Sequence, residues 1–124
     1  MRERPRVPIS IHTRDIDGIA VLDLSGDSSI TDGTILQQTV RGLIEAGKRF
    51  FVLNLQNVRY LDSFGLGQIV ATYQNVRGHK GDLKIINPNS AVRDLLRYTR
   101  IDTVVQVLPS EAEAVQELRK LATQ

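Results

Sequence analysis

The side chain best suited to chemistry in this 124-residue chain is the hydroxyl of Ser63, within the run Asp62-Ser63-Phe64-Gly65-Leu66-Gly67. A serine hydroxyl can attack a substrate, cap a helix or accept a phosphoryl group. The run follows a strand-like apolar segment and begins a series of apolar residues at helical spacing, so Ser63 is expected at a helix N-terminus. Two glycines in a first helical turn each cost about 1 kcal/mol relative to alanine. They therefore predict a close approach of the backbone to a neighbour.

A nucleophilic role for Ser63 has little support in the rest of the sequence. A nucleophilic serine needs a general base within hydrogen-bonding distance and donors for the developing oxyanion. The chain has only two histidines, His12 and His79, and they lie far apart in sequence. The serine elbow of the α/β-hydrolases has a glycine two residues before the serine, where this chain has Leu61. We therefore predict that the chain is not an enzyme and has no hydrolase or kinase activity.

The composition argues against a metal ion, a cofactor or a nucleic acid as a ligand. The chain has no cysteine, and its two histidines fall in different predicted elements, so no metal site is expected. Gly65 and Gly67 are not followed by the glycine and Lys-Ser/Thr of a phosphate-binding loop, so no cofactor is expected. The formal net charge is only +2 and the basic residues are dispersed, unlike the basic patch of a nucleic-acid-binding protein.

The length and the apolar pattern predict one domain that does not insert into a membrane. No apolar run reaches the roughly 18 residues that a membrane-spanning helix needs. Residues 1–8, with Arg2, Arg4 and Arg6, are interpreted as a flexible basic arm, because they lack the apolar segment of a secretion signal. Residues 9–124 form the predicted domain, and we expect a cytoplasmic protein.

Strands and helices are expected to alternate around Ser63. Apolar segments at residues 9–13 and 19–24 flank Asp17-Gly18, a dipeptide typical of tight hairpin turns, so they predict an antiparallel pair. Residues 50–55 form an apolar run that is typical of a strand buried on both faces. Two further strands are expected at residues 82–87 and 104–108. The expected helices begin at Thr31, Ser63, Ser90 and Ser110.

This order of elements predicts an α/β fold with a mixed β-sheet of four to five strands and helices mainly on one face. The segment between residues 24 and 50 is long enough to cross over and place the two flanking strands parallel. The buried strand then leads directly to Asp62 and Ser63.

A helix N-terminus would tolerate a phosphoryl group on Ser63, because its unpaired N–H groups and the positive end of the helix dipole favour negative charge. The residues alone leave two alternatives open: Ser63 accepts a phosphate, or it only caps the helix with help from Asp62. Phe64 likewise either packs in the core or is exposed for a partner.

The motif Leu61-Asp62-Ser63-x-Gly65-Leu66-Gly67 resembles that of the STAS domain family and, within it, of the bacterial anti-anti-sigma factors, also called anti-sigma factor antagonists. The resemblance covers nearly the whole chain from about Ile9. It includes the Leu24-Ser25-Gly26 turn, the strand at residues 52–55 and the stretch at residues 86–92.

The resemblance implies an STAS-like fold and a phosphoprotein that regulates transcription through signal transduction. In this family an anti-sigma factor that is also a serine-protein kinase phosphorylates the serine after the motif aspartate, which matches Ser63. The resemblance therefore favours a phosphoacceptor over a simple cap. It implies that the unphosphorylated protein binds the anti-sigma factor and frees a sigma factor, and that a phosphatase is a further partner.

The partner-binding residues that the resemblance implies are Ser29, Asp62, Ser63, Phe64, Gly65, Leu66 and Gly67. Asp62 would orient and cap, the two glycines would permit close approach of the partner, and Phe64 and Leu66 would supply apolar contact.

Two positions depart from the family pattern. Phe64 stands where serine or threonine is usual in the sigma-controlling members, and it resembles some scaffold members of stressosome complexes. Ser29 stands where an acidic residue is common, although Asp27 is close. The alternative function is therefore a scaffold subunit of a stressosome or a transport complex, with a constitutive interface.

Overall fold

The computed structural model describes residues 7–28 and 33–123, which form a five-stranded mixed sheet with helices on both sides. The strands follow the sequence order across the sheet. They are β1 (Ser10–Ile16), β2 (Ile19–Ser28), β3 (Phe50–Leu61), β4 (Asp82–Ile86) and β5 (Val107–Leu108). The helices are α1 (Ile35–Glu45), α2 (Ser63–Gly78), α3 (Ser90–Tyr98), the short 3-10 helix η2 (Ile101–Thr103) and α4 (Glu111–Ala122).

The predicted hairpin at the start of the domain is present. β1 and β2 pair antiparallel, and Ile16 lies opposite Ile19 across the turn. Asp17 and Gly18 have φ angles of 54° and 87°. Positive φ at both central residues is the conformation that matches the twist of a two-residue hairpin. All later pairs, β2 with β3, β3 with β4 and β4 with β5, are parallel, so the predicted mixed sheet is confirmed.

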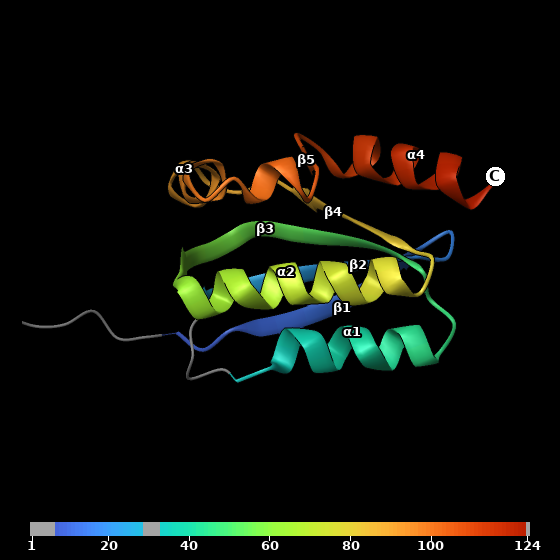
Figure 1. The fold of residues 1–124 in the computed structure, drawn as a ribbon, viewed down its shortest axis with the longest axis horizontal. Coiled ribbons are helices and arrows are strands. Elements are labelled where there is room, and N and C mark those ends of the chain that lie inside the picture. Colours follow the sequence, from blue (N-terminus) through green and yellow to red (C-terminus); the bar gives the residue numbers. More distant parts are fainter. Residues whose placement is uncertain (1–6, 29–32, 124) are drawn as a thin grey trace, which may run out of the picture.

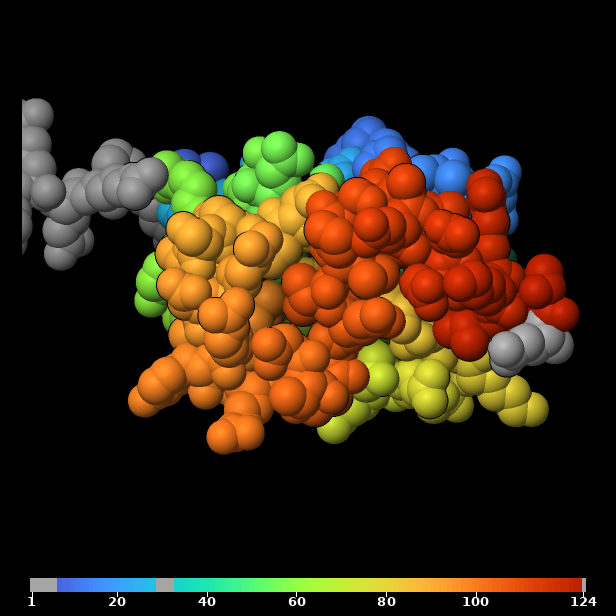
Figure 2. Space-filling view, turned by 90° about the horizontal axis from the view of Figure 1, so that it is seen from above, coloured from blue at the N-terminus to red at the C-terminus, as the bar shows by residue number. Residues whose placement is uncertain are grey.

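β3 is the centre of the sheet and is buried on both faces, as its apolar run predicted. Phe51 and Leu53 belong to a core cluster with the apolar residues of α1, α2 and α3, whereas Val52 packs in a second cluster with α4. In Figure 1, α2 is drawn in front of β1 and β2 with α1 below it, and α3 and α4 lie above β3. Figure 2 looks down on α3 and α4, in gold to red. The helices therefore lie mainly on one face, as predicted, and α4 covers the other face, since a strand that is apolar on both sides needs a covering layer on each.

β2 and β3 extend further than the sequence suggested, to Ser28 and Leu61. Beyond Leu55, the residues of β3 are mostly polar and exposed, and the pairing with β2 has two register shifts. This extension carries the chain without a loop into Asp62 and the start of α2. Thr31, the predicted start of the first helix, lies outside the described residues. Within the described residues, α1 begins at Ile35.

Candidate functional site

Asp62 joins the end of β3 to the start of α2 and fixes the geometry of this junction. Its backbone is extended, and its side-chain Oδ1 accepts a hydrogen bond from the Gly65 N–H at 2.8 Å. Its own N–H donates to the carbonyl oxygen of Ser28 at 3.2 Å, which ties the junction to the end of β2. The helix cap is therefore Asp62. The alternative in which Ser63 caps the helix is wrong, because Ser63 is already the first residue of α2.

The side chain of Ser63 is exposed at the N-terminus of α2. The first N–H groups of a helix have no acceptor within the helix itself. Asp62 satisfies the N–H of Gly65, so those of Ser63 and Phe64 are not used by this cap. The hydroxyl therefore stands at the positive end of the helix dipole, where an attached phosphate would be electrostatically favoured.

Gly65 and Gly67 have different surroundings, although both are in the first turns of the helix. Gly65 is buried, and a Cβ atom there would lie 2.7 Å from Ser28 Oγ and 2.9 Å from Ser28 O. The close backbone approach that the glycines predicted is therefore made at Gly65, within the chain itself. Gly67 is exposed, and a Cβ atom there would meet nothing within 4 Å. Of the two, Gly67 is the one with open space for a partner.

The two apolar residues predicted to contact a partner are also unequal. Leu66 is only 8% exposed and belongs to the main core cluster. Phe64 is half-buried, so part of its ring is accessible beside Ser63. Tyr60, near the end of β3, is 56% exposed and adds an aromatic side chain close to Ser63 in sequence. The alternation of strand side chains could have found it, because Leu61 points inward and its neighbour must point away.

Asp27, near the end of β2, carries the charge beside this junction. Its carboxylate accepts hydrogen bonds from Arg59 Nε and Nη2 at 3.1 and 2.9 Å and from the Val7 N–H at 2.9 Å. The hydrogen bond to Asp27 raises the pKa of Arg59. Val7 and Pro8, the last two residues of the predicted arm, are thus held against β2. Residues 1–6 and Ser29, a predicted partner-binding position, lie outside the described residues.

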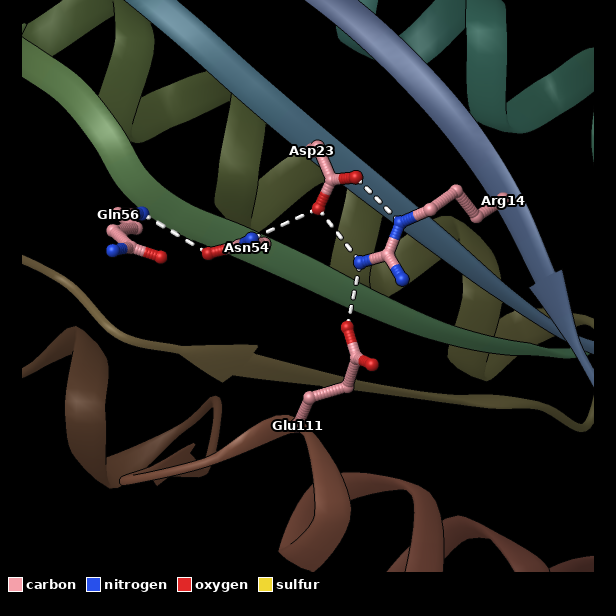
Figure 3. Close-up of polar contacts among 5 residues, drawn as sticks. All are labelled: Arg14, Asp23, Asn54, Gln56 and Glu111. Atoms are coloured by element: carbon pink, nitrogen blue, oxygen red, sulfur yellow. Dashed lines mark hydrogen bonds and ion pairs between the residues drawn. The ribbon is translucent and has the colours of Figure 1, made fainter.

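A second cluster of polar side chains, which was not predicted, lies on the side of the sheet that α4 covers. Arg14 of β1 bonds both carboxylate oxygens of Asp23 at 2.6 and 2.9 Å and reaches Glu111 of α4 at 2.6 Å (Figure 3). Asn54 donates to Asp23 at 2.8 Å and accepts from the Gln56 N–H. The hydrogen bond from Arg14 lowers the pKa of Asp23. We call these five residues the Arg14 cluster; it links the first strand of the sheet to the last helix.

The geometry gives Ser63 no histidine base on its own helix. His79 stands at the C-cap of α2, and a 16-residue helix is about 24 Å long. His12 lies in β1, opposite Asp23 in β2. Within residues 7–28 and 33–123, no three acidic or histidine side chains group as metal ligands would. In the same ranges, no helix has the length and apolar character needed to cross a membrane.

Comparisons with known proteins agree with this geometry. The STAS domain matches residues 10–114. The anti-sigma F factor antagonist of Paenibacillus polymyxa is 26% identical over 102 residues, which are 82% of this chain and 87% of that protein. An anti-sigma factor antagonist from Mycobacterium paratuberculosis has a similar fold, with a TM-score of 0.80 and 24% identity over 90% of this chain and 94% of that one. The Bacillus cell fate determinant SpoIIAA, solved in its phosphorylated form, has a TM-score of 0.67 at 15% identity, covering 87% of this chain and 98% of that one.

Proposed function

Because this chain belongs to the STAS domain family, we propose that it is an anti-sigma factor antagonist controlled by phosphorylation of Ser63. In this proposal the unphosphorylated protein binds an anti-sigma factor that is also a serine-protein kinase, and a sigma factor is released. Phosphate on Ser63 weakens that binding, and a phosphatase reverses it. The relatives compared above are named as regulators, in agreement with the prediction that the chain is not an enzyme.

The observation that carries the proposal is that Asp62 caps α2 and leaves the neighbouring Ser63 exposed. A kinase needs a serine hydroxyl that it can reach, and a fold needs the helix to be capped. Asp62 supplies the cap through its bond to the Gly65 N–H, so the exposed hydroxyl of Ser63 is not needed for it. Ser63 can be modified without removal of the helix cap.

The effect of the phosphate on binding follows from its charge. A phosphoserine carries about −1.5 to −2 charges at pH 7 and adds them next to the Asp62 carboxylate. The N-terminus of α2 stabilises this charge in the free protein. A partner that binds over the same surface must remove water from the charge or oppose it with its own carboxylates, and such like-charge contact is unfavourable.

The described surface around Ser63 offers the other contacts that the proposed partner requires. Phe64 and Tyr60 provide accessible aromatic area, a residue type enriched where proteins bind each other. Gly67 leaves room for close approach one turn along α2. Ser29 remains a proposed contact from the family resemblance. A cytoplasmic location follows from the proposed role.

The test is a pull-down from the native host with the unmodified chain, followed by mass spectrometry of the peptide that contains Ser63. We expect an anti-sigma factor of the histidine-kinase-like ATPase type among the captured proteins and phosphate on Ser63 after incubation with ATP. Ser63→Ala should abolish the label and retain the kinase. Labelling of Thr72 or Ser90 instead would contradict the proposal. Capture of a scaffold assembly that is indifferent to phosphate would favour the constitutive alternative.

A further inference from the structure

A groove of about 280 Å³ lies between α3 and the segment that contains η2 and β5, and none of its lining residues belongs to α2. Arg93, Leu96 and Arg97 of α3 form one wall. Asp102, Leu108 and Pro109 line the other side. The lining therefore combines exposed charged side chains with the partly buried apolar side chains of Val107 and Leu108, the composition of a site that fixes both the charge and the position of a ligand.

The two arginines of the groove are available for a ligand. Arg93 and Arg97 are both exposed and stand four residues apart, so they project from the same side of α3. In the part of the chain that the structure describes, neither forms an ion pair, in contrast to Arg14 and Arg59, which each hold an aspartate. Arginine binds carboxylates through two parallel hydrogen bonds, so an unpaired couple of this kind favours an acidic ligand.

Two exposed apolar side chains flank η2 in the sequence. Tyr98 at the end of α3 is 87% exposed, and Val104 after η2 is 52% exposed. β5 is the last strand of the sheet and pairs only with β4 among the described strands, so its outer edge is open. An open strand edge can pair with an extended peptide. These features together extend over more surface than a small anion would cover.

We propose that this groove binds an acidic, partly apolar segment of a partner protein. Carboxylates of the segment pair with Arg93 and Arg97, and an apolar side chain packs on Val107 and Leu108, which line the groove and are only partly buried. The site is separate from the Ser63 surface, and the proposal does not depend on the proposed regulatory function.

The test is a fluorescence anisotropy titration of the full chain against a short fluorescein-labelled peptide of alternating aspartate and leucine. Arg97→Glu should weaken binding about tenfold or more, because it places like charges against each other. Arg41→Glu is the matched control, since Arg41 is exposed on α1, which packs against α2 and does not line the groove, and this variant should bind as the parent does. In an NMR titration, the amide signals of Leu96, Val107 and Leu108 should move.

Four results would overturn the proposal. They are equal loss of binding in Arg97→Glu and Arg41→Glu, equal affinity for a peptide with serine in place of leucine, complete competition by inorganic phosphate, and loss of binding in Ser63→Ala. The phosphate result would indicate a small-anion site, and the Ser63→Ala result would place the peptide on α2. Retained binding in Ser63→Ala supports a separate site, whatever the outcome of the kinase experiment.

Discussion

The N-terminus of α2 and the Arg14 cluster use polar side chains in opposite ways. In the Arg14 cluster, the guanidinium and its two carboxylates satisfy one another across β1, β2 and α4 (Figure 3). At α2, the carboxylate of Asp62 satisfies a backbone N–H and leaves the neighbouring hydroxyl exposed. The first arrangement holds elements together, and the second holds an unengaged group at a fixed place. The comparison teaches that the Ser63 hydroxyl is available for modification because the residue before it, Asp62, caps the helix.

The largest expected loss of stability is at Gly65. Gly65→Val should destabilise the protein by roughly 1–3 kcal/mol or more, because its side chain would overlap Ser28 where α2 meets β2. Chemical denaturation followed by circular dichroism measures this. Gly67→Ala is the matched control and should leave the free energy of unfolding unchanged or raise it, since its Cβ meets open space and alanine is the better helix former. Equal destabilisation by both variants would contradict the account of the junction.

Asp62→Ala tests the cap directly. It should lower the free energy of unfolding by about 0.5–2 kcal/mol, the usual range for loss of an N-cap side chain. Ser63→Ala should cost much less, because its hydroxyl does not cap the helix. Urea denaturation of the two variants in parallel checks the order. A larger loss from Ser63→Ala than from Asp62→Ala would mean that the two residues have exchanged roles.

The smallest expected effect is in the Arg14 cluster. Its ion pairs are partly exposed, and such pairs contribute about 0–1 kcal/mol. Because Arg14 lowers the pKa of Asp23 in the folded state, this stability is present above the unfolded pKa of about 3.9 and is lost as the pH falls through the lower folded value.

Asp23→Asn should remove the part of the acid-induced loss of stability that Asp23 contributes. Thermal melts between about pH 2 and 5, at low and at high salt, measure this loss. Glu117→Gln is a suitable control, because within the described residues Glu117 forms an ion pair only with Lys120, an exposed residue of the same helix. An Asp23→Asn profile that follows the parent throughout would show that the cluster adds nothing measurable.

Local patterns predicted the parts of the fold that depend on neighbouring residues. Asp17-Gly18 specified the hairpin, and the apolar run at residues 50–55 specified the central strand. The end of that strand was missed because residues 56–60 are mostly polar and do not resemble a buried strand. The predicted edge strand at residues 104–108 is reduced to Val107–Leu108, because the chain first forms η2 and leaves Val104 exposed.

The candidate site was predicted in its residues more fully than in their roles. The pattern placed Asp62 and Ser63 at a helix start but could not separate cap from exposed hydroxyl, since the two differ by one position. Gly65 and Gly67 looked equivalent in sequence, and only the packing of Ser28 distinguishes them. The Arg14 cluster could not be predicted, because Arg14 and Glu111 are 97 residues apart and their contact depends on the finished fold.

The most direct test of the central claim is a calorimetric titration of the captured anti-sigma factor with four forms of this chain: unmodified, phosphorylated on Ser63, Ser63→Ala and Ser63→Asp. We expect the unmodified and alanine forms to bind with similar affinity, because neither adds charge beside Asp62. Phosphorylation should weaken binding about tenfold or more, and aspartate should weaken it less, since a carboxylate carries less charge and fewer acceptor oxygens than a phosphate. Equal affinity of the phosphorylated and unmodified forms would contradict the account.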